Sequence, residues 1–382
     1  MAFALANGKV LARDGFARGE TVLIEGPTIV ALVADGDPRL AGATRLDLAG
    51  RLLLPGFIDT QVNGGGGVLF NDSPSVEGIR AIGAAHRRFG TTGFLPTLLS
   101  DDLRVLQRAI EAVDEAIAAG VPGVLGIHIE GPFLSEARKG VHDATHFLEL
   151  DHDMVALLSS LKRGKTMMTL APEVTSPGVI QRLARAGVIL SAGHTNATGD
   201  EIDAARRHGL KGFTHLFNAM SQLSAREPGA VGAALADDDS YCGLIVDGKH
   251  VDPRVLRIVL KAKRHNRLML VTDAMPSVGT HERSFQLQGR TISVVDGYCV
   301  DEQGTLAGTA LDMARAVRNT TALLGVPLGE AVRMASEYPA DFLGLGGSVG
   351  RIAAGCRADL VVADDELNVL ETWIGGERLA SG

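Results

Sequence analysis

The chain has 382 residues, a formal net charge of -8, 46% hydrophobic residues and only 4% aromatic residues. The acidic balance argues against a nucleic-acid-binding surface and against a polybasic membrane patch. The three cysteines (Cys242, Cys299 and Cys356) are far apart and form no CxxC pair. We therefore expect no disulfide framework and a reduced, cytoplasmic protein. No apolar run reaches the roughly 20 residues that a membrane span needs, and residues 1–10 do not have the pattern of a secretory signal, so we expect a soluble protein that is not exported.

Both ends of the chain predict short strands separated by turns. Residues 9–15, 20–33 and 44–56 alternate apolar and polar positions and are broken at Gly and Pro, and residues 350–380 have the same character. Neither end could bury a sheet face alone. We expect both ends, residues 1–51 and 346–382, to form one small β-sandwich domain beside a central body of residues 52–345.

The central body alternates short apolar runs with amphipathic stretches. The expected strands are Leu52–Val62, Thr92–Leu98, Gly123–Ile129, Thr166–Ala171, Val188–Ala192, Gly212–His215, Cys242–Val246 and Leu268–Val271. The expected helices are Val76–Phe89, Leu103–Ala119, Val179–Ala186, Asp200–His208, Pro253–His265, Ala310–Leu324 and Leu328–Leu343. Eight strands with interleaved helices predict an α/β fold, a (β/α)8 TIM-like barrel. The alternative, a doubly wound open sheet, predicts a GxGxxG loop, and the glycines at 64–67 lack that spacing.

Polar residues follow the expected strands at the point where each strand ends. Such residues are His128, Glu130, Glu173, His194, His215, Asn218, Asp247, His250 and Asp273. Each has an ordinary structural explanation when taken alone, such as a satisfied histidine, a capping carboxylate or a turn aspartate. The carboxyl ends of barrel strands converge on one mouth, however, where active sites are found. Their recurrence at successive strand ends therefore predicts a shared site.

Glu130, His194 and His215 are the residue types of a catalytic metal centre. Two imidazoles and one carboxylate bind Zn²⁺ or Fe²⁺ and leave a position open for water, whose pKa the metal lowers. Asp273 could take the proton of that water and pass it to a leaving group, or it could be a fourth metal ligand. We expect His128 to be structural or to support the ligands. The histidines expected at the surface are His86, His146, His152, His208, His265 and His281.

A series of motifs resembles one known family. GIHIEGPFLS, APE, SAGHTNAT, THLFNAMS, REPG, DGKHV, VTDA and GTLAGTAL follow one another between residues 126 and 311. In this order they resemble the N-acetylglucosamine-6-phosphate deacetylases of the amidohydrolase superfamily, and the resemblance covers nearly the whole chain. It implies that water hydrolyses the acetamide of N-acetyl-D-glucosamine 6-phosphate, giving D-glucosamine 6-phosphate and acetate.

The resemblance also implies a role for each matching residue. Glu130, His194 and His215 match the metal ligands, Asp273 the general base and acid, and His142 the histidine that polarises the amide carbonyl. The residues that match the surroundings of the sugar phosphate are Val141, Asn218, Ala219, Arg226, His250, Leu306, Ala307 and Gly308. The main-chain amides at 218 and 219 and the guanidinium of Arg226 are the expected phosphate donors. His250 in this family can reach across from a second subunit, which implies a homodimer.

Two amides occupy the positions where many members of the superfamily carry an HxH motif. These amides are Gln61 and Asn63, and amides are poor ligands for a tightly held transition metal. We therefore expect one divalent metal per subunit, Zn²⁺ or Fe²⁺, with Gln61 supporting the ligands or holding a water. Two other functions stay open: hydrolysis of a related substrate such as N-acetylgalactosamine 6-phosphate, and a silent sugar-phosphate-binding barrel. The silent barrel would require the loss of a ligand or the base, and all four residues are present.

Overall fold

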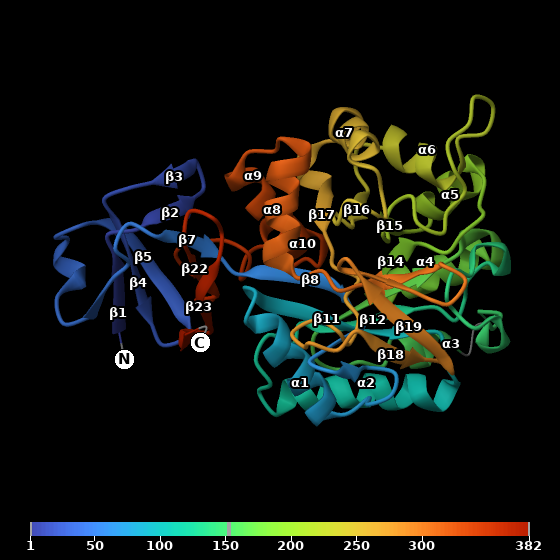
Figure 1. Ribbon diagram of the computed structural model, residues 1–382, viewed down its shortest axis with the longest axis horizontal. Helices are drawn as coiled ribbons and strands as arrows, with labels where there is room; N and C mark the ends of the chain where they lie inside the picture. The colour runs from blue at the N-terminus through green and yellow to red at the C-terminus, as the bar shows by residue number, and fades with distance from the viewer. Residues whose placement is uncertain (1, 151–153, 381–382) are drawn as a thin grey trace.

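The computed structural model describes residues 2–150 and 154–380, and its larger part is a nearly closed parallel barrel (Figure 1). The strands are β8 (Phe57–Val62), β11 (Thr91–Leu99), β12 (Gly126–Glu130), β13 (Lys165–Leu170), β14 (Ile189–Ala192), β15 (Leu210–Phe213), β16 (Tyr241–Leu244) and β17 (Leu268–Leu270). They are hydrogen-bonded in chain order from β8 to β17. Val62 also forms a parallel bridge with Ala274, just beyond β17, which draws the two edges together. The expected barrel is confirmed.

Helices alternate with the barrel strands along the chain. They are α1 (Val76–Arg87), α2 (Leu103–Ala118), α3 (Met154–Leu158), α4 (Pro177–Arg185), α5 (Gly199–Arg207), α6 (Gly229–Ala236), α7 (Pro253–Ala262), α8 (Met313–Leu324), α9 (Leu328–Met334) and α10 (Glu337–Phe342). Side-chain caps explain several starts; α5, for example, begins with a capping box between Thr198 and Glu201. No helix within the described ranges has both the length and the apolar character of a membrane span.

The helices differ from the expectation over Leu328–Leu343 and at α6 and the short α3, neither of which was expected. The single helix expected over Leu328–Leu343 is two helices, α9 and α10, because Pro339 lacks the N–H that would bond to Ala335 in a continuous helix. The sequence analysis missed α6 because its stretch GAVGAALA has no polar face and therefore no helical periodicity. Its residues Gly229 to Ala234 are buried instead.

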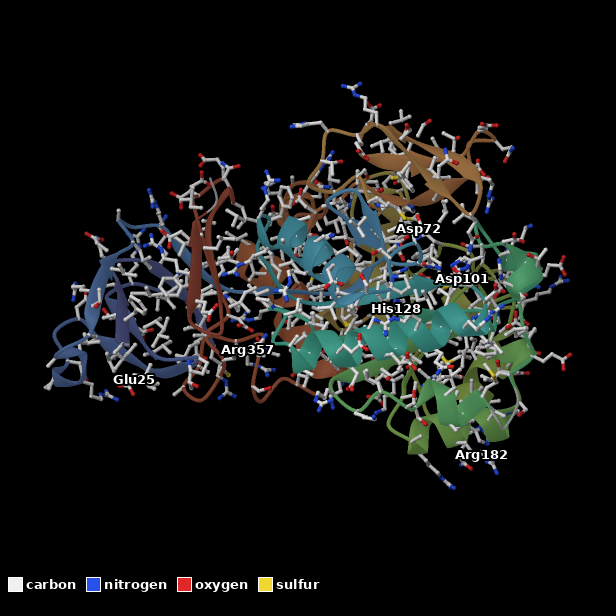
Figure 2. The ribbon with its side chains drawn as sticks, turned by 90° about the horizontal axis from the view of Figure 1, so that it is seen from below. Glu25, Asp72, Asp101, His128, Arg182 and Arg357 are labelled. Carbon is white, nitrogen blue, oxygen red and sulfur yellow. The ribbon has the colours of Figure 1, made fainter. Side chains whose placement is uncertain are left out.

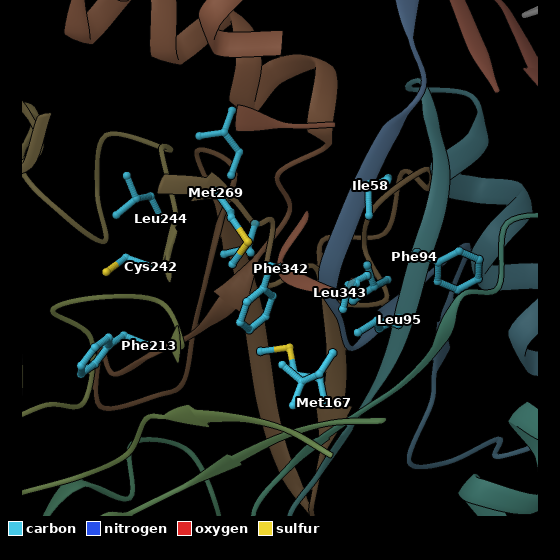
Figure 3. Close-up of a cluster of buried hydrophobic side chains, with 14 of the residues drawn as sticks. Ile58, Phe94, Leu95, Met167, Phe213, Cys242, Leu244, Met269, Phe342 and Leu343 are labelled. Carbon is cyan, nitrogen blue, oxygen red and sulfur yellow. The ribbon is translucent and has the colours of Figure 1, made fainter. Parts of the chain in front are cut away.

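The barrel core is built from apolar side chains of the strands and the helices that cover them. Figure 3 shows part of it, where Phe342 of α10 lies among Met167, Met269 and Leu343. Gly212 of β15 allows this approach, since a Cβ there would lie 2.9 Å from the Phe342 ring. Burial of such side chains contributes about 1.5–3 kcal/mol each relative to exposure, so the core fixes the strands that carry the site.

Both ends of the chain meet in a second body, drawn blue and red beside the barrel (Figure 1). One sheet contains β1 (Ala2–Ala6), β4 (Glu20–Glu25), β5 (Thr28–Ala34) and β6 (Thr44–Asp47), and the other contains β2 (Lys9–Ala12), β3 (Gly15–Ala17), β7 (Leu52–Pro55), β22 (Leu360–Ala363), β23 (Val369–Ile374) and β24 (Glu377–Ala380). The two sheets share a core that includes Leu5, Leu53 and Trp373, as a sandwich requires.

The strand expected over Leu52–Val62 is divided between the two bodies. Its first part, β7, pairs with β2 and β22, and its second part, β8, begins the barrel. The break falls at Gly56, where a Cβ would lie 1.9 Å from the Thr92 hydroxyl oxygen. β7 thus pairs with strands of the chain ends, although it lies on the barrel side of the expected boundary at residue 51. The division of the chain into two domains stays a prediction.

A small antiparallel sheet that the sequence analysis did not predict lies between β17 and α8. It consists of β18 (Ser284–Leu287), β19 (Arg290–Val295), β20 (Tyr298–Val300) and β21 (Leu306–Thr309). Its buried residues Leu287 and Ile292 pack with Leu99, Val141 and Met275. The sheet therefore covers the mouth of the barrel on the side of β11. Another short hairpin, β9 (Gly64–Gly65) with β10 (Val68–Leu69), follows β8.

Candidate active site

A cavity of about 410 Å³ opens at the carboxyl ends of the barrel strands. The predicted site residues that line it are Glu130, Val141, His142, His194, His215, Asn218, Ala219, His250, Asp273, Leu306 and Gly308. Arg226, Ala307 and Gln61 do not line it. Strands β12, β14, β15 and β17 deliver Glu130, His194, His215 and Asp273 from positions as far as 143 residues apart in sequence (273 minus 130). The barrel therefore gathers the residues expected to share one site.

Glu130, His194 and His215 place three donor atoms close together. Nε2 of His215 lies 3.0 Å from Oε1 of Glu130 and 3.1 Å from Nε2 of His194, and the third side of the triangle is 3.4 Å. Four ligands about 2.0–2.1 Å from a tetrahedral Zn²⁺ would be separated by roughly 3.3 Å. The spacing and the donor types therefore fit a metal ion.

The surroundings of the three residues support the same interpretation. Nδ1 of His194 lies 3.0 Å from the carbonyl oxygen of Arg138, an acceptor that fixes Nδ1 as the protonated nitrogen and leaves Nε2 free to bind. Burial raises the pKa of Glu130, but hydrogen bonds with His194 and His215 hold it well below its usual range. The carboxylate is therefore ionised, as a metal ligand must be.

Several residues of the site have a left-handed backbone conformation. His194, His215 and Asp273 have φ angles of 47°, 34° and 52°, and Ala219 has 49°. Residues with a Cβ rarely adopt such angles, and they persist where the surrounding structure holds them, commonly in active sites. These turns follow β14, β15 and β17, and the side chains of His194, His215 and Asp273 line the cavity there.

Asp273 lies between two amide side chains. Nδ2 of Asn63 donates to its Oδ1 over 2.7 Å, and Nε2 of Gln61 lies 3.1 Å from the same oxygen. Gln61 also donates to both carboxylate oxygens of Glu130, at 3.0 and 3.2 Å. Burial, followed by the charge of Glu130, raises the pKa of Asp273 to about 6. A carboxyl group with a pKa near neutrality is suited to accept and return a proton.

His142 closes another side of the cavity. Its ring is buried beside His194, with ring centroids 4.4 Å apart, and burial lowers its pKa well below the usual value. Nδ1 lies 2.9 Å from the hydroxyl of Ser100 and accepts from the Ser100 main-chain N–H over 3.4 Å. A main-chain N–H can only donate, so Nδ1 is the unprotonated nitrogen and Nε2 carries the hydrogen. Sequence reasoning missed Ser100, which follows β11.

His250 and Ala219 offer the cavity hydrogen-bond donors for an anion. Nδ1 of His250 is held by Asp247 at 2.6 Å, which leaves Nε2 available. Ala219 lines the cavity, and its N–H has no hydrogen-bond partner among residues 2–150 and 154–380. The expected second amide, that of Asn218, already donates to the carbonyl of His215 over 3.0 Å. Its availability to a phosphate is therefore reduced, although Asn218 does line the cavity.

The arginines are placed differently from the expectation. Arg226 is exposed and does not line the cavity of its own chain. Arg138 does line it, and its Nε donates to Asn196 over 2.9 Å. Sequence reasoning missed Arg138, although its position four residues before His142 was a usable signal.

Other histidines also test the expectations. His86 was expected at the surface, but it is fully buried in α1 and its Nε2 lies 2.9 Å from the carbonyl oxygen of Gly64. His265 and His281 are exposed as expected, whereas His146 and His208 are half-buried; His152 lies outside the described residues. His128 of β12, which is labelled in Figure 2, is buried between the hydroxyls of Thr97 and Thr169 and does not line the cavity. Its position agrees with the expectation that His128 is structural or supports the ligands, and which of the two it does stays a prediction.

Comparison with known proteins places the chain in a family. Residues 52–379 match the amidohydrolase family. An N-acetylgalactosamine-6-phosphate deacetylase of Shewanella sp. is 46% identical over 86% of this chain and 83% of its own length. The crystal structure of an N-acetylglucosamine-6-phosphate deacetylase from Pasteurella multocida has a TM-score of 0.96 and 36% identity over 100% of both chains. A mutant of the Mycobacterium smegmatis enzyme in complex with N-acetyl-D-glucosamine 6-phosphate has a TM-score of 0.90 and 33% identity, covering 99% of this chain and 98% of its own. The resemblance seen in the sequence is thus confirmed, and the chain belongs to the amidohydrolase family.

Proposed function

We propose that this protein hydrolyses the acetamide of N-acetyl-D-glucosamine 6-phosphate to D-glucosamine 6-phosphate and acetate. The observation that carries the proposal is the convergence of Glu130, His194, His215 and Asp273 on one cavity whose wall also offers anion donors. Solved structures named for this activity superpose over the whole chain, which supports the same substrate class.

Glu130, His194 and His215 would hold one divalent metal, Zn²⁺ or Fe²⁺. When bound there, such an ion lowers the pKa of a water and withdraws electron density from a carbonyl oxygen. Gln61 and Asn63 present N–H groups where a second set of ligands would be needed, which supports a single ion per chain.

Asp273 and His142 would carry the proton chemistry. Asp273 takes a proton from the attacking water as the carbon–oxygen bond forms, and it then delivers that proton to the nitrogen as the carbon–nitrogen bond breaks. His142, neutral and protonated on Nε2, donates a hydrogen bond to the carbonyl oxygen as negative charge develops there. The products are acetate and the free amine, so no further reactant is needed.

The phosphate would lie at the end formed by Ala219 and His250. A free main-chain N–H and an imidazole held by Asp247 suit an anion, and Arg138 adds a permanent positive charge to the wall. Leu306 and Gly308 would cover the sugar ring, with Ala307 buried behind them. Arg226 could contact a phosphate only from outside the cavity of its own chain. A homodimer remains part of the proposal on the resemblance alone, and light scattering coupled to size-exclusion chromatography measures it.

A second substrate has a specific observation in its favour. The N-acetylgalactosamine-6-phosphate deacetylase of Shewanella is more similar to this chain in sequence, at 46% identity, than the two solved structures named for the glucosamine substrate. The two sugars differ only in the configuration at C4, so the amide chemistry and the phosphate contacts serve both. We also propose a cytoplasmic location, which the free and buried state of Cys242, Cys299 and Cys356 supports.

Steady-state release of acetate tests both substrates together. Metal-quantified protein is assayed with N-acetylglucosamine and N-acetylgalactosamine, each with and without a 6-phosphate. We expect kcat/KM for N-acetylglucosamine 6-phosphate to exceed that for the unphosphorylated sugar by roughly 100-fold or more, as loss of charge-assisted bonds implies. A higher kcat/KM for the galactosamine phosphate would reassign the substrate, and equal rates without phosphate would remove the role of Ala219 and His250.

A further inference from the structure

The turn between β18 and β19 carries an unusual residue. Leu287 pairs with Arg290, so only Gln288 and Gly289 form the turn, with φ angles of 48° and 77°. Two-residue turns with two left-handed positions strongly favour Asn, Asp or Gly at the first of them. Glutamine gains no such local advantage and carries a Cβ into a strained conformation. A residue in a backbone conformation that its type disfavours indicates that its side chain makes an interaction of importance to the structure or the function.

The side chain of Gln288 bridges two segments of the barrel mouth. Its Nε2 donates to the carbonyl oxygen of Ser100 over 2.7 Å, and its Oε1 accepts from the main-chain N–H of Asp143 over 3.2 Å. Ser100 follows β11, and Asp143 lies in the loop after β12. Both ends of one amide are thus used, each on a main-chain group.

The two segments that Gln288 joins are the two sides of His142. Asp143 is its neighbour in sequence, and Ser100 supplies both partners of its Nδ1. The other neighbour, Val141, is also held by the same hairpin, because the guanidinium of Arg290 donates to the Val141 carbonyl. The hairpin therefore holds the backbone before and after His142 as well as the group that sets its tautomer.

The hairpin itself is firmly anchored. Leu287 and Ile292 are buried against Leu99 and Val141, and these contacts belong to one apolar cluster. Its position relative to the barrel is therefore set by packing, and Gln288 extends from that fixed support. Such support for a reacting group matters because a displacement of about 1 Å can cost on the order of 100-fold in rate.

We infer that Gln288 is a positioning residue that holds His142 with Nε2–H directed into the cavity. Its effect on catalysis rests on the proposed function, whereas its effect on the histidine ring does not. Without the bridge, the Ser100 carbonyl and the Asp143 N–H would turn to water, and the loop with His142 would be free to shift away from β11.

Kinetics of Gln288→Gly test the consequence for catalysis. Glycine suits both φ angles of the turn and removes the amide, so the hairpin should still form. We expect kcat to fall roughly 10- to 100-fold with KM changed by only about twofold, because the substrate carbonyl needs the donor most in the transition state. Gln286→Gly is the matched control: Gln286 is exposed in the same hairpin, and among the residues that the structure describes its amide bonds only to Thr291. Its loss should leave kcat unchanged.

A double-mutant cycle separates positioning from general support. If Gln288 acts through His142, adding Gln288→Gly to His142→Asn should lower kcat no further. Additive losses would overturn the inference, as would a wild-type kcat in Gln288→Gly.

A spectroscopic measurement stands independently of turnover. In zinc-loaded protein with ¹⁵N-labelled histidine, the His142 ring should show the Nε2–H tautomer in the wild type and a mixture or broadened signals in Gln288→Gly. Unchanged His142 signals in the variant would overturn the inference even if the wild type released no acetate. Failure of acetate release in the wild type, by contrast, would refute only the proposed function.

Discussion

Gln61 of β8 and Glu130 of β12 are joined by hydrogen bonds past the intervening strand β11, with Nε2 of Gln61 3.0 and 3.2 Å from the two carboxylate oxygens. A histidine at position 61 would offer a lone pair to a metal, whereas the amide offers N–H groups. These N–H groups also reach Asp273, so one side chain bonds to both carboxylates of the site. The amide thus removes a ligand position and at the same time reduces the repulsion between Glu130 and Asp273.

Replacing Gln61 with Leu should therefore impair turnover. Hydrogen bonds to charged groups are worth about 1.5–3 kcal/mol, so we expect kcat to fall roughly 10- to 100-fold. The kcat of Gln61→Glu should fall further, because this variant adds a third carboxylate beside Glu130 and Asp273. Steady-state kinetics on metal-loaded variants measure both effects. A wild-type kcat for Gln61→Leu would show that its bonds to Glu130 and Asp273 do not matter.

Asp273→Asn should abolish the proton transfer and spare binding. We expect kcat to fall by roughly 10²- to 10⁴-fold, the usual contribution of a general base, while calorimetry finds the substrate affinity nearly unchanged. Asp252→Asn is a control of the same chemical change at the N-cap of α7, away from the cavity, and should retain the wild-type kcat. Turnover by Asp273→Asn at the wild-type rate would refute the assigned role.

Elemental analysis of the purified protein should find one divalent metal per chain. His215→Ala should lose most of it, since two remaining ligands bind far more weakly than three. His146→Ala is the matched control, because His146 with Asp101 and Asp102 forms a second, more exposed group of possible ligands. Its metal content should equal that of the wild type. Two metals per active chain would contradict the argument from Gln61 and Asn63.

His86 should make the protein less stable in acid. Burial lowers its pKa from 6.5 to about 4, so between these values the unfolded chain binds a proton that the folded chain does not. Its contribution to the free energy of unfolding is present above pH 6.5 and is lost as the pH falls toward 4, by ~3 kcal/mol.

Urea unfolding of His86→Gln between pH 4 and 7.5 measures this effect. The free energy of unfolding of the wild type should fall as the pH drops below 6.5. That of His86→Gln should fall less over the same range. The exposed His265 offers a control, since His265→Gln should decline like the wild type. If the free energy of unfolding depended on pH equally in His86→Gln and in the wild type, protonation of the buried ring would have no effect on stability.

Much of the fold and of the site was predictable from local patterns. Alternating apolar runs and amphipathic stretches identified the barrel, because burial on a strand or helix has a regular period. Polar residues at the strand ends identified Glu130, His194, His215 and Asp273, because parallel strands in a barrel bring those ends together. The buried position of His86 was not predictable, since α1 does not reveal which neighbour covers it.

The sequence by itself determined the chemical character of this protein: a (β/α)8 chain with two carboxylates and two imidazoles at its strand ends. Only the tertiary structure decided which groups support them. Gln61 joins Glu130 to Asp273, and Gln288 joins Ser100 to Asp143, over separations of up to 212 residues. Such pairs follow no sequence period, because hydrogen bonds between distant segments depend on where packing has already placed the backbone.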